Sequence, residues 1–210
     1  MERIPVITDL FKTLYGPESL NHQLFMVINH AHHPFMDPIM EACITLGSSR
    51  MIYWYVALLL LVALVRRDIM PLRYIWLYCL AVAIGIGAEE FLKVIFQIPR
   101  PVLAIGRERV LILGEIKLYN SFPSGHATFA FLSAYMLSYG RSLAWKLPFF
   151  AFAILVGWSR VYDGAHYPLD VAGGAILGMT IGFMVWKAYE LIVRRLVKKQ
   201  PCVEEKEQPS

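Results

Sequence analysis

Charged residues are scarce in this chain of 210 residues. Asp, Glu, Lys and Arg together make up 17% of the sequence, against about 25% in an average soluble domain. With so few charges and 57% hydrophobic residues, the composition excludes a disordered chain, an ordinary cytosolic globule and a nucleic-acid-binding tail protein. The net charge of +4 is mild, so its placement along the chain is more informative than its size.

Cysteine is also sparse. The three cysteines, Cys43, Cys79 and Cys202, are odd in number and far apart. This spacing predicts neither a disulfide framework nor a CxxC metal site, and it leaves the redox compartment open.

Long apolar runs, in contrast, are abundant. A helix that spans a membrane needs about 20 mostly apolar residues, because lipid offers the backbone no water to bond. Five stretches fit this description, at 48–65, 74–96, 123–139, 147–163 and 168–192. The first is short, so we expect it to extend back toward Asp37-Pro38, with Gly47 as a soft point.

A weaker apolar stretch at 23–35 is either a sixth span or an interfacial helix. His30, His32 and His33 favour the interfacial position, within an amphipathic segment over residues 1–35. The predicted fold is therefore all-α, a polytopic membrane helical bundle with five to six transmembrane helices. Residues 1–200 are expected to form its single domain, and residues 201–210 a disordered cytoplasmic tail.

Basic residues set the expected orientation in a cell membrane. They gather in segments that share one side if five helices alternate: Arg66, Arg67, Arg73, Arg141, Lys146, Arg194, Arg195, Lys198 and Lys199. By the positive-inside rule this side is cytoplasmic. The loop 97–122 and the connection 161–167 then lie on the non-cytoplasmic face.

Two further patterns concern packing. Gly174, Gly178 and Gly182 recur at every fourth residue, as do Ala83 and Gly87, and this spacing lets two helix backbones approach closely. All five tryptophans fall near predicted helix ends, as in an aromatic belt at the membrane interfaces: Trp54, Trp76, Trp145, Trp158 and Trp186.

Three clusters of polar residues fall at the non-cytoplasmic face. Ionisable groups in or beside membrane helices are costly, so each cluster is a functional hypothesis. They are Lys93 with Arg100-Pro101, then Pro123-Ser124-Gly125-His126, then Ser159-Arg160 with His166 and Asp170.

The second cluster is typical of a helix start. Pro123 suits the first helical position, with Ser121 as a cap. The free N–H groups of the first turn would then form an anion site, and Gly125 allows a ligand to approach closely. His126 is placed to give a proton to a group bound there. A capped helix with a surface histidine is the alternative interpretation.

The third cluster repeats this architecture, with a helix start at Pro168. Asp170 in the first turn would accept a bond from one imidazole nitrogen of His166 and leave the other free as a nucleophile. Lys93, Arg100 and Arg160 would neutralise a phosphoryl group. Glu89 and Glu90 precede Lys93 at helical spacing, so one of them is expected to pair with it.

At this point the chain resembles the type 2 phosphatidic acid phosphatases, the PAP2 or lipid phosphate phosphatase superfamily. Its signature is Lys, six residues, Arg-Pro; then Pro-Ser-Gly-His; then Ser-Arg, five residues, His, three residues, Asp. All eleven fixed residues match between Lys93 and Asp170, at every internal spacing. The resemblance extends over residues 20–192 through the flanking helices.

The resemblance implies a phosphatase with its site at the non-cytoplasmic end of the bundle. His166 would attack phosphorus and form a phosphohistidine, Asp170 would orient His166, and His126 would protonate the leaving oxygen. The phosphoryl oxygens would be held by five residues: Lys93, Arg100, Ser124, Gly125 and Arg160. The family typically works without a metal, so the resemblance implies no metal and no cofactor.

The substrate is implied less sharply. Small members of the family that resemble this chain are bacterial polyprenyl diphosphate phosphatases, which makes undecaprenyl diphosphate the preferred lipid substrate in the bilayer. Phosphatidic acid, phosphatidylglycerol phosphate, lipid A and a lipid phosphotransferase reaction stay open. The sequence predicts no nucleic-acid partner and leaves the oligomeric state undetermined.

Other classes fit less well. Vanadium haloperoxidases share the scaffold but are large soluble proteins, and a channel or transporter would need polar groups along a path through the bilayer. A metal site at His22, His30, His32 and His33 is disfavoured, because no Cys, Asp or Glu nearby completes a convincing ligand set.

Overall fold

The computed structural model describes residues 12–67 and 71–198, and these residues are helical or lie in turns and loops, without a strand among them. The helices are α2 (Leu20–Asn29), α3 (Asp37–Leu46), α4 (Ile52–Val65), α5 (Leu72–Phe96), α6 (Pro101–Ile105), α7 (Gly125–Ser138), α8 (Leu143–Tyr162) and α9 (Pro168–Lys198). Single 3-10 turns occur at Ser49–Met51 and Arg107–Arg109. The all-α prediction is confirmed for this part of the chain. The predicted tail 201–210 lies outside the described residues.

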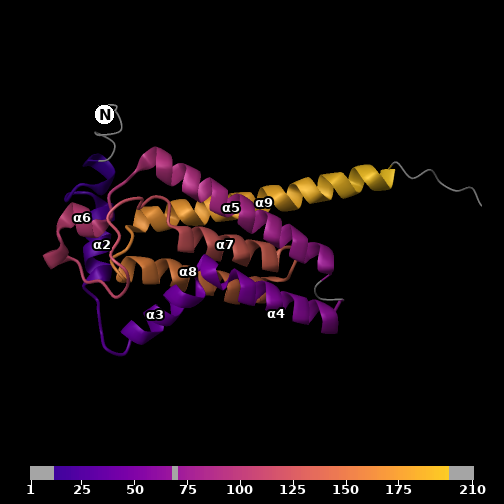
Figure 1. Cartoon of the computed structure of the whole chain (residues 1–210), viewed down its shortest axis with the longest axis horizontal. Coiled ribbons are helices and arrows are strands. Elements are labelled where there is room, and N and C mark those ends of the chain that lie inside the picture. The colour runs from indigo at the N-terminus through magenta and orange to yellow at the C-terminus, as the bar shows by residue number, and fades with distance from the viewer. Residues whose placement is uncertain (1–11, 68–70, 199–210) are drawn as a thin grey trace, which may run out of the picture.

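The long helices run side by side along the longest axis of the molecule (Figure 1). The α7 helix is central and packs against α9, α8 and α5. Its buried residues include Leu132 and Met136, which belong to one hydrophobic cluster with Tyr78 and Val82 of α5. At one end of the bundle lie α2 and α6, together with the start of α9 (Figure 1). Loop 97–122 follows α5 and contains α6.

The five predicted apolar stretches correspond to α4, α5, α7, α8 and α9, with ends shifted by a few residues. The predicted weak point at Gly47 corresponds to a bend between two helical segments. The helical segments Asp37–Leu46 and Ser49–Val65 meet at an angle of 57°, and Gly47 caps the first of them. A Cβ at Gly47 would overlap Val156 of α8, so this bend depends on a close approach of backbone to side chain.

Length and composition identify fewer spans than the sequence predicts. Among the described residues, Pro168–Val197 is long and apolar enough to cross a membrane, and the bent pair Asp37–Leu46 with Ser49–Val65 would be a second if it forms one span. The count of five to six spans stays a prediction. The α2 helix has 10 residues and rises about 15 Å, half the thickness of the hydrocarbon core.

The glycine repeat of α9 forms the seam with α7. A Cβ at Gly174 would lie 2.5 Å from the Ser124 carbonyl oxygen, and a Cβ at Gly178 would overlap the Thr128 carbonyl oxygen. The packing prediction is therefore confirmed for this stripe. It is wrong for Gly87 of α5, which is exposed, because a Cβ at that position would meet no neighbouring atom within 4 Å.

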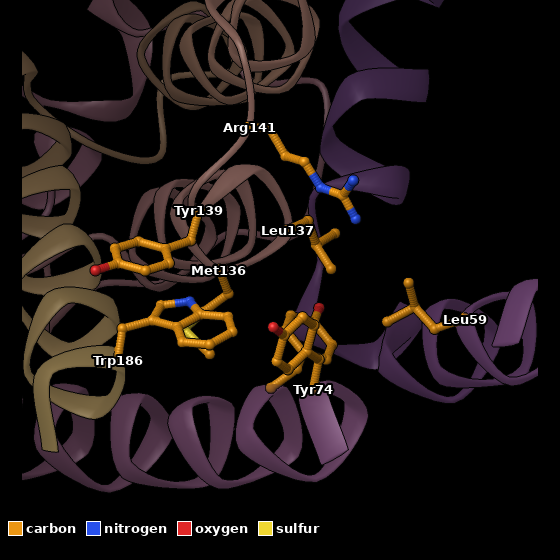
Figure 2. A pocket seen from close by; sticks show the side chains of 8 residues that line it. Leu59, Tyr74, Met136, Leu137, Tyr139, Arg141 and Trp186 are labelled. Atoms are coloured by element: carbon orange, nitrogen blue, oxygen red, sulfur yellow. The ribbon is translucent and has the colours of Figure 1, made fainter. Parts of the chain in front are cut away.

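Aromatic residues fill the other end of α7. Figure 2 shows Tyr139 over the Trp186 indole, and the two rings stack at 4.7 Å. They line a pocket with Tyr74 and Arg141 that contains none of the predicted site residues. Trp186 is 5% exposed, so its predicted place in a lipid-facing belt is wrong, because the side chain packs inside the bundle.

Candidate active site

The amino end of α7 carries the second motif, with a helix that starts two residues later than predicted. Ser124 is the N-cap and the helix begins at Gly125. The Ser124 N–H donates to the Asp170 carbonyl oxygen at 3.0 Å, which ties α7 to the first turn of α9. The prediction that Pro123 begins the helix and Ser121 caps it is wrong, because this tertiary bond holds Ser124 outside the helix.

The amino end of α9 carries the third motif. The helix begins at Pro168, as predicted. His166, in the preceding loop, is 2% exposed, and Asp170 is fully buried. The His166 Nδ1 lies 3.7 Å from the Asp170 Oδ2, which is longer than a hydrogen bond. The structure thus brings the two side chains close together without a hydrogen bond between these two atoms.

The Asp170 carboxylate has other hydrogen-bond donors. Tyr15 donates to Oδ1 at 2.8 Å. Ser121 donates its hydroxyl to Oδ2 at 2.5 Å, and the Tyr167 N–H donates to the same oxygen at 2.8 Å. The sequence does not indicate the role of Tyr15, because it lies 155 residues from Asp170 and belongs to no motif.

Arg100 is held by backbone carbonyl groups. Its guanidinium donates to the carbonyl oxygens of Tyr119 at 3.0 Å and Ala165 at 3.2 Å. Burial lowers the pKa of Arg100 to about 10, and the charge of Arg160 contributes, so Arg100 remains cationic at neutral pH. Because Ala165 precedes His166, this contact fixes a positive charge beside the histidine loop.

Arg160 lies at the end of α8 and pairs with Asp163 at 2.9 Å. Asp163 also accepts from the N–H groups of Leu113 and Gly114, at 3.1 and 2.8 Å. One carboxylate therefore orients Arg160 and holds loop 97–122 against the site. Burial raises the pKa of Asp163, although the charge of Arg160 opposes this. Sequence reasoning missed Asp163, whose one signal was its spacing of three residues from Arg160.

Lys93 is paired with two carboxylates in the last turns of α5. It contacts Glu89, and it lies 3.1 Å from Glu90, so the predicted pairing is confirmed. The Glu89 carboxylate also packs against Gly125, where a Cβ would overlap it. Through Glu89, Lys93 is placed at the amino end of α7.

These segments gather cationic groups around His166. Burial lowers its pKa well below the usual value, and the charges of Arg100, Arg160 and Lys93 lower it further. His126, in the first turn of α7, interacts electrostatically with Arg160 and His166. Among the described residues, the buried polar atoms without a hydrogen-bond partner include Ser124 Oγ, Arg160 Nε and His166 Nδ1. Such a cluster of cations and unpaired polar groups suits an anionic ligand.

Two of the N-terminal histidines form hydrogen bonds with backbone carbonyl oxygens of distant segments. His30 pairs with the Arg109 carbonyl oxygen at 3.1 Å, and His32 with that of Tyr162 at 2.9 Å. His32 also lies 3.3 Å from Asp37, so an acidic neighbour is closer than the sequence suggested. The described residues contain no group of three or more metal-ligating side chains.

The fold, the site and the proteins that the chain resembles together define a class of protein: a helical membrane phosphatase that acts on lipid phosphates. The chain belongs to the PAP2 superfamily, whose family model matches residues 74–194. It is 27% identical over 195 residues to the undecaprenyl-diphosphatase BcrC of Bacillus subtilis. The aligned region covers 86% of this chain and 97% of that protein.

Two solved structures share the fold. LpxE of Aquifex aeolicus aligns with a TM-score of 0.71 and 33% identity, over 80% of this chain and 96% of that one. A transmembrane PAP2 type phosphatidylglycerolphosphate phosphatase from Bacillus subtilis aligns with a TM-score of 0.70 and 23% identity, over 89% and 92% of the two chains. The second likeness concerns the fold alone.

Proposed function

We propose that the protein hydrolyses undecaprenyl diphosphate through a phosphohistidine intermediate on His166. The observation that carries the chemistry is the buried His166 beside Asp170, with the charges of Arg100, Arg160 and Lys93 acting on it. The substrate rests on the likeness to BcrC, which covers almost the whole of both chains.

The reaction takes two balanced steps. In the first, the His166 Nε2 attacks the terminal phosphorus, the phosphoanhydride P–O bond breaks, and His126 gives its proton to the leaving oxygen of undecaprenyl phosphate. In the second, water attacks the phosphohistidine and gives a proton to His126, the N–P bond breaks, and inorganic phosphate leaves. Asp170 stabilises the positive charge that forms on His166.

The transferred phosphoryl group needs positioning and charge stabilisation more than further covalent chemistry. Arg100 and Arg160 present planar guanidinium groups to its oxygens, and Lys93 acts as a point charge. The Ser124 hydroxyl and the Gly125 N–H complete the proposed phosphate site. These groups come from the protein itself, so we propose that the reaction is independent of metal.

The orientation is proposed from the distribution of charge. Arg66, Arg67, Arg141 and Arg194 follow the carboxyl ends of α4, α7 and the apolar part of α9, at the end of the bundle away from α2 and α6 (Figure 1). By the positive-inside rule that end faces the cytoplasm. The site then opens on the non-cytoplasmic face of the cell membrane, where undecaprenyl diphosphate would be returned to its monophosphate form.

The first test is phosphate release by the detergent-purified protein with EDTA present. Undecaprenyl diphosphate, phosphatidic acid and phosphatidylglycerol phosphate are assayed at equal mole fraction in mixed micelles. We expect release from all active lipids to persist in EDTA and to be fastest with undecaprenyl diphosphate. Loss of activity in EDTA would contradict metal independence, and a faster monophosphate lipid would change the assigned substrate. Release only after an acceptor alcohol is added would identify a phosphotransferase.

The pH profile tests the two histidine roles. His166 must be neutral to attack, and because its pKa lies below the usual value, it stays neutral as the pH falls to about 6.5. The acid limb of kcat/KM is therefore expected below about pH 6.5. An alkaline limb is expected in kcat, where His126 loses the proton that it donates, because the negative charge of the bound phosphoryl group offsets the cations Arg160 and Arg100 that act on this imidazole. A monotonic profile between pH 4 and 10 would remove this assignment.

A further inference from the structure

Tyr15 reaches the catalytic centre from outside the three motifs. It ends the helical residues 12–15, ahead of α2, and its side chain is 5% exposed. Its ring meets that of Tyr167 edge-on, with centroids 5.2 Å apart. Its hydroxyl donates to the Asp170 Oδ1 at 2.8 Å. The N-terminal segment thus contributes a polar contact to a fully buried carboxylate.

The two oxygens of Asp170 have different partners. Oδ2 receives the Ser121 hydroxyl and the Tyr167 N–H, and it is also the oxygen that lies 3.7 Å from His166. Oδ1 receives the Tyr15 hydroxyl. Because a carboxylate rotates about its last torsion angle, a donor on Oδ1 fixes which oxygen faces His166.

We propose that Tyr15 is a positioning residue for this reaction, which with Ser121 holds the Asp170 carboxylate in the orientation that faces His166. The proposal rests on the assignment of His166 as the nucleophile. It makes the N-terminal segment part of the catalytic apparatus, in addition to any interfacial role. A second contact supports this, since the Leu169 N–H donates to the Asn21 side-chain oxygen at 2.9 Å and joins α2 to the same turn of α9.

The charges around Asp170 determine how the hydrogen bond from Tyr15 affects His166. Burial and the neighbouring charge of Asp170 raise the pKa of Tyr15 far above its usual value, so the phenol keeps its proton and is the donor. Arg100 is the cation that acts on Asp170 from the loop before α6, and His166 faces it from the loop before α9. When the Tyr15 donor is removed, more of the carboxylate charge acts on His166, and the pKa of His166 rises.

The test compares Tyr15→Phe with the wild-type protein. The substitution keeps the ring and its packing and removes the hydroxyl. We expect kcat to fall about tenfold, the lower end of the range for a lost hydrogen bond to a charged group, with KM changed less than about twofold. The acid limb of kcat/KM should move to higher pH by about half a unit or more. Ser121→Ala, which removes a donor from Oδ2, should shift the limb in the same direction.

The matched control is Tyr78→Phe. Tyr78 is 1% exposed, and its hydroxyl bonds to Ser133 at 3.0 Å, between α5 and α7. This variant also loses a buried tyrosine hydroxyl, and we expect its kcat and pH profile to match the wild type. Thermal unfolding of every variant separates loss of fold from loss of function.

The outcomes separate this proposal from the proposed function. If Tyr15→Phe has the wild-type kcat, or loses rate with an unmoved acid limb, Tyr15 is structural and the proposal fails. If His166→Ala keeps its activity in the same assay, the phosphohistidine mechanism fails instead. If no lipid is hydrolysed, NMR titration of the His166 imidazole in wild type and Tyr15→Phe makes the same comparison, and an unchanged titration midpoint would overturn the positioning role.

Discussion

Replacement of His166 by alanine is expected to abolish phosphate release, with a fall in kcat of about 10⁴-fold or more, the range found when a catalytic nucleophile is removed. The physical reason is that no other side chain at the site is placed to replace it. His126 is the proposed proton donor, and the remaining groups, Arg100, Arg160 and Lys93, are cations that hold oxygen atoms without forming a bond to phosphorus. Their charge would still bind the substrate, so KM should change much less than kcat.

The control for this loss is His22→Ala, which removes a histidine of α2 that belongs to none of the motifs. It should keep the wild-type rate. Both variants should unfold at temperatures close to that of the wild type. His166→Ala removes a polar ring that lies among cations, so little apolar contact is lost, and His22 is only partly buried. Rapid acid-free quenching with ³²P-labelled substrate should trap labelled protein in the wild type and none in His166→Ala. Turnover by His166→Ala within tenfold of the wild type would require a different nucleophile.

Local sequence signals predicted the features that short-range chemistry determines. Pro168 begins α9 because a missing N–H costs nothing at the first helical position, and Glu89 and Glu90 pair with Lys93 because helical spacing puts them on one face. The bend at Gly47 follows from the same kind of signal. These predictions needed only residues within one or two turns of each other.

Contacts between segments that are distant in the sequence could not be predicted from such local signals. Tyr15 and Asp170 are 155 residues apart, and neither periodicity nor motif spacing relates them. Pro123 fails as a helix start for the same reason, since the bond from Ser124 to Asp170 in α9 decides where α7 begins. The sequence thus indicated the candidate residues of the proposed site, while the carboxylate and hydroxyl groups that contact them depend on tertiary packing.

The two glycine patterns also show that local sequence signals do not predict which helices are in contact. Gly178 and Gly87 have the same local signature, a small residue four positions from another in an apolar helix. One faces the backbone of α7 and the other faces outward. A pattern along one helix identifies a narrow stripe, but the position of the neighbouring helix decides whether that stripe is a contact.

This difference gives a matched pair of substitutions, Gly178→Ala and Gly87→Ala. Each adds one methyl group to a helix interior, where alanine is favoured over glycine by roughly 0.5–1 kcal/mol. At Gly178 the new Cβ would overlap the Thr128 carbonyl oxygen and lie 2.9 Å from the Leu132 nitrogen, both backbone atoms that cannot rotate away. We expect a net destabilisation of about 2 kcal/mol, within the range for overpacked interiors. Gly87→Ala should leave stability unchanged or slightly higher.

The measurement is thermal unfolding in detergent, followed by tryptophan fluorescence. A loss of about 2 kcal/mol should lower the Tm of Gly178→Ala by several degrees. Activity should fall as well, because α9 can accept the methyl group only by moving away from α7, and at the amino ends of these two helices Ser124 is bonded to Asp170 at 3.0 Å. Separation of the helices would therefore open the phosphate site. Equal Tm values for the two alanine variants would mean that α7 and α9 are not in backbone contact, and the arrangement that joins Ser124 to Asp170 would have to be abandoned with it.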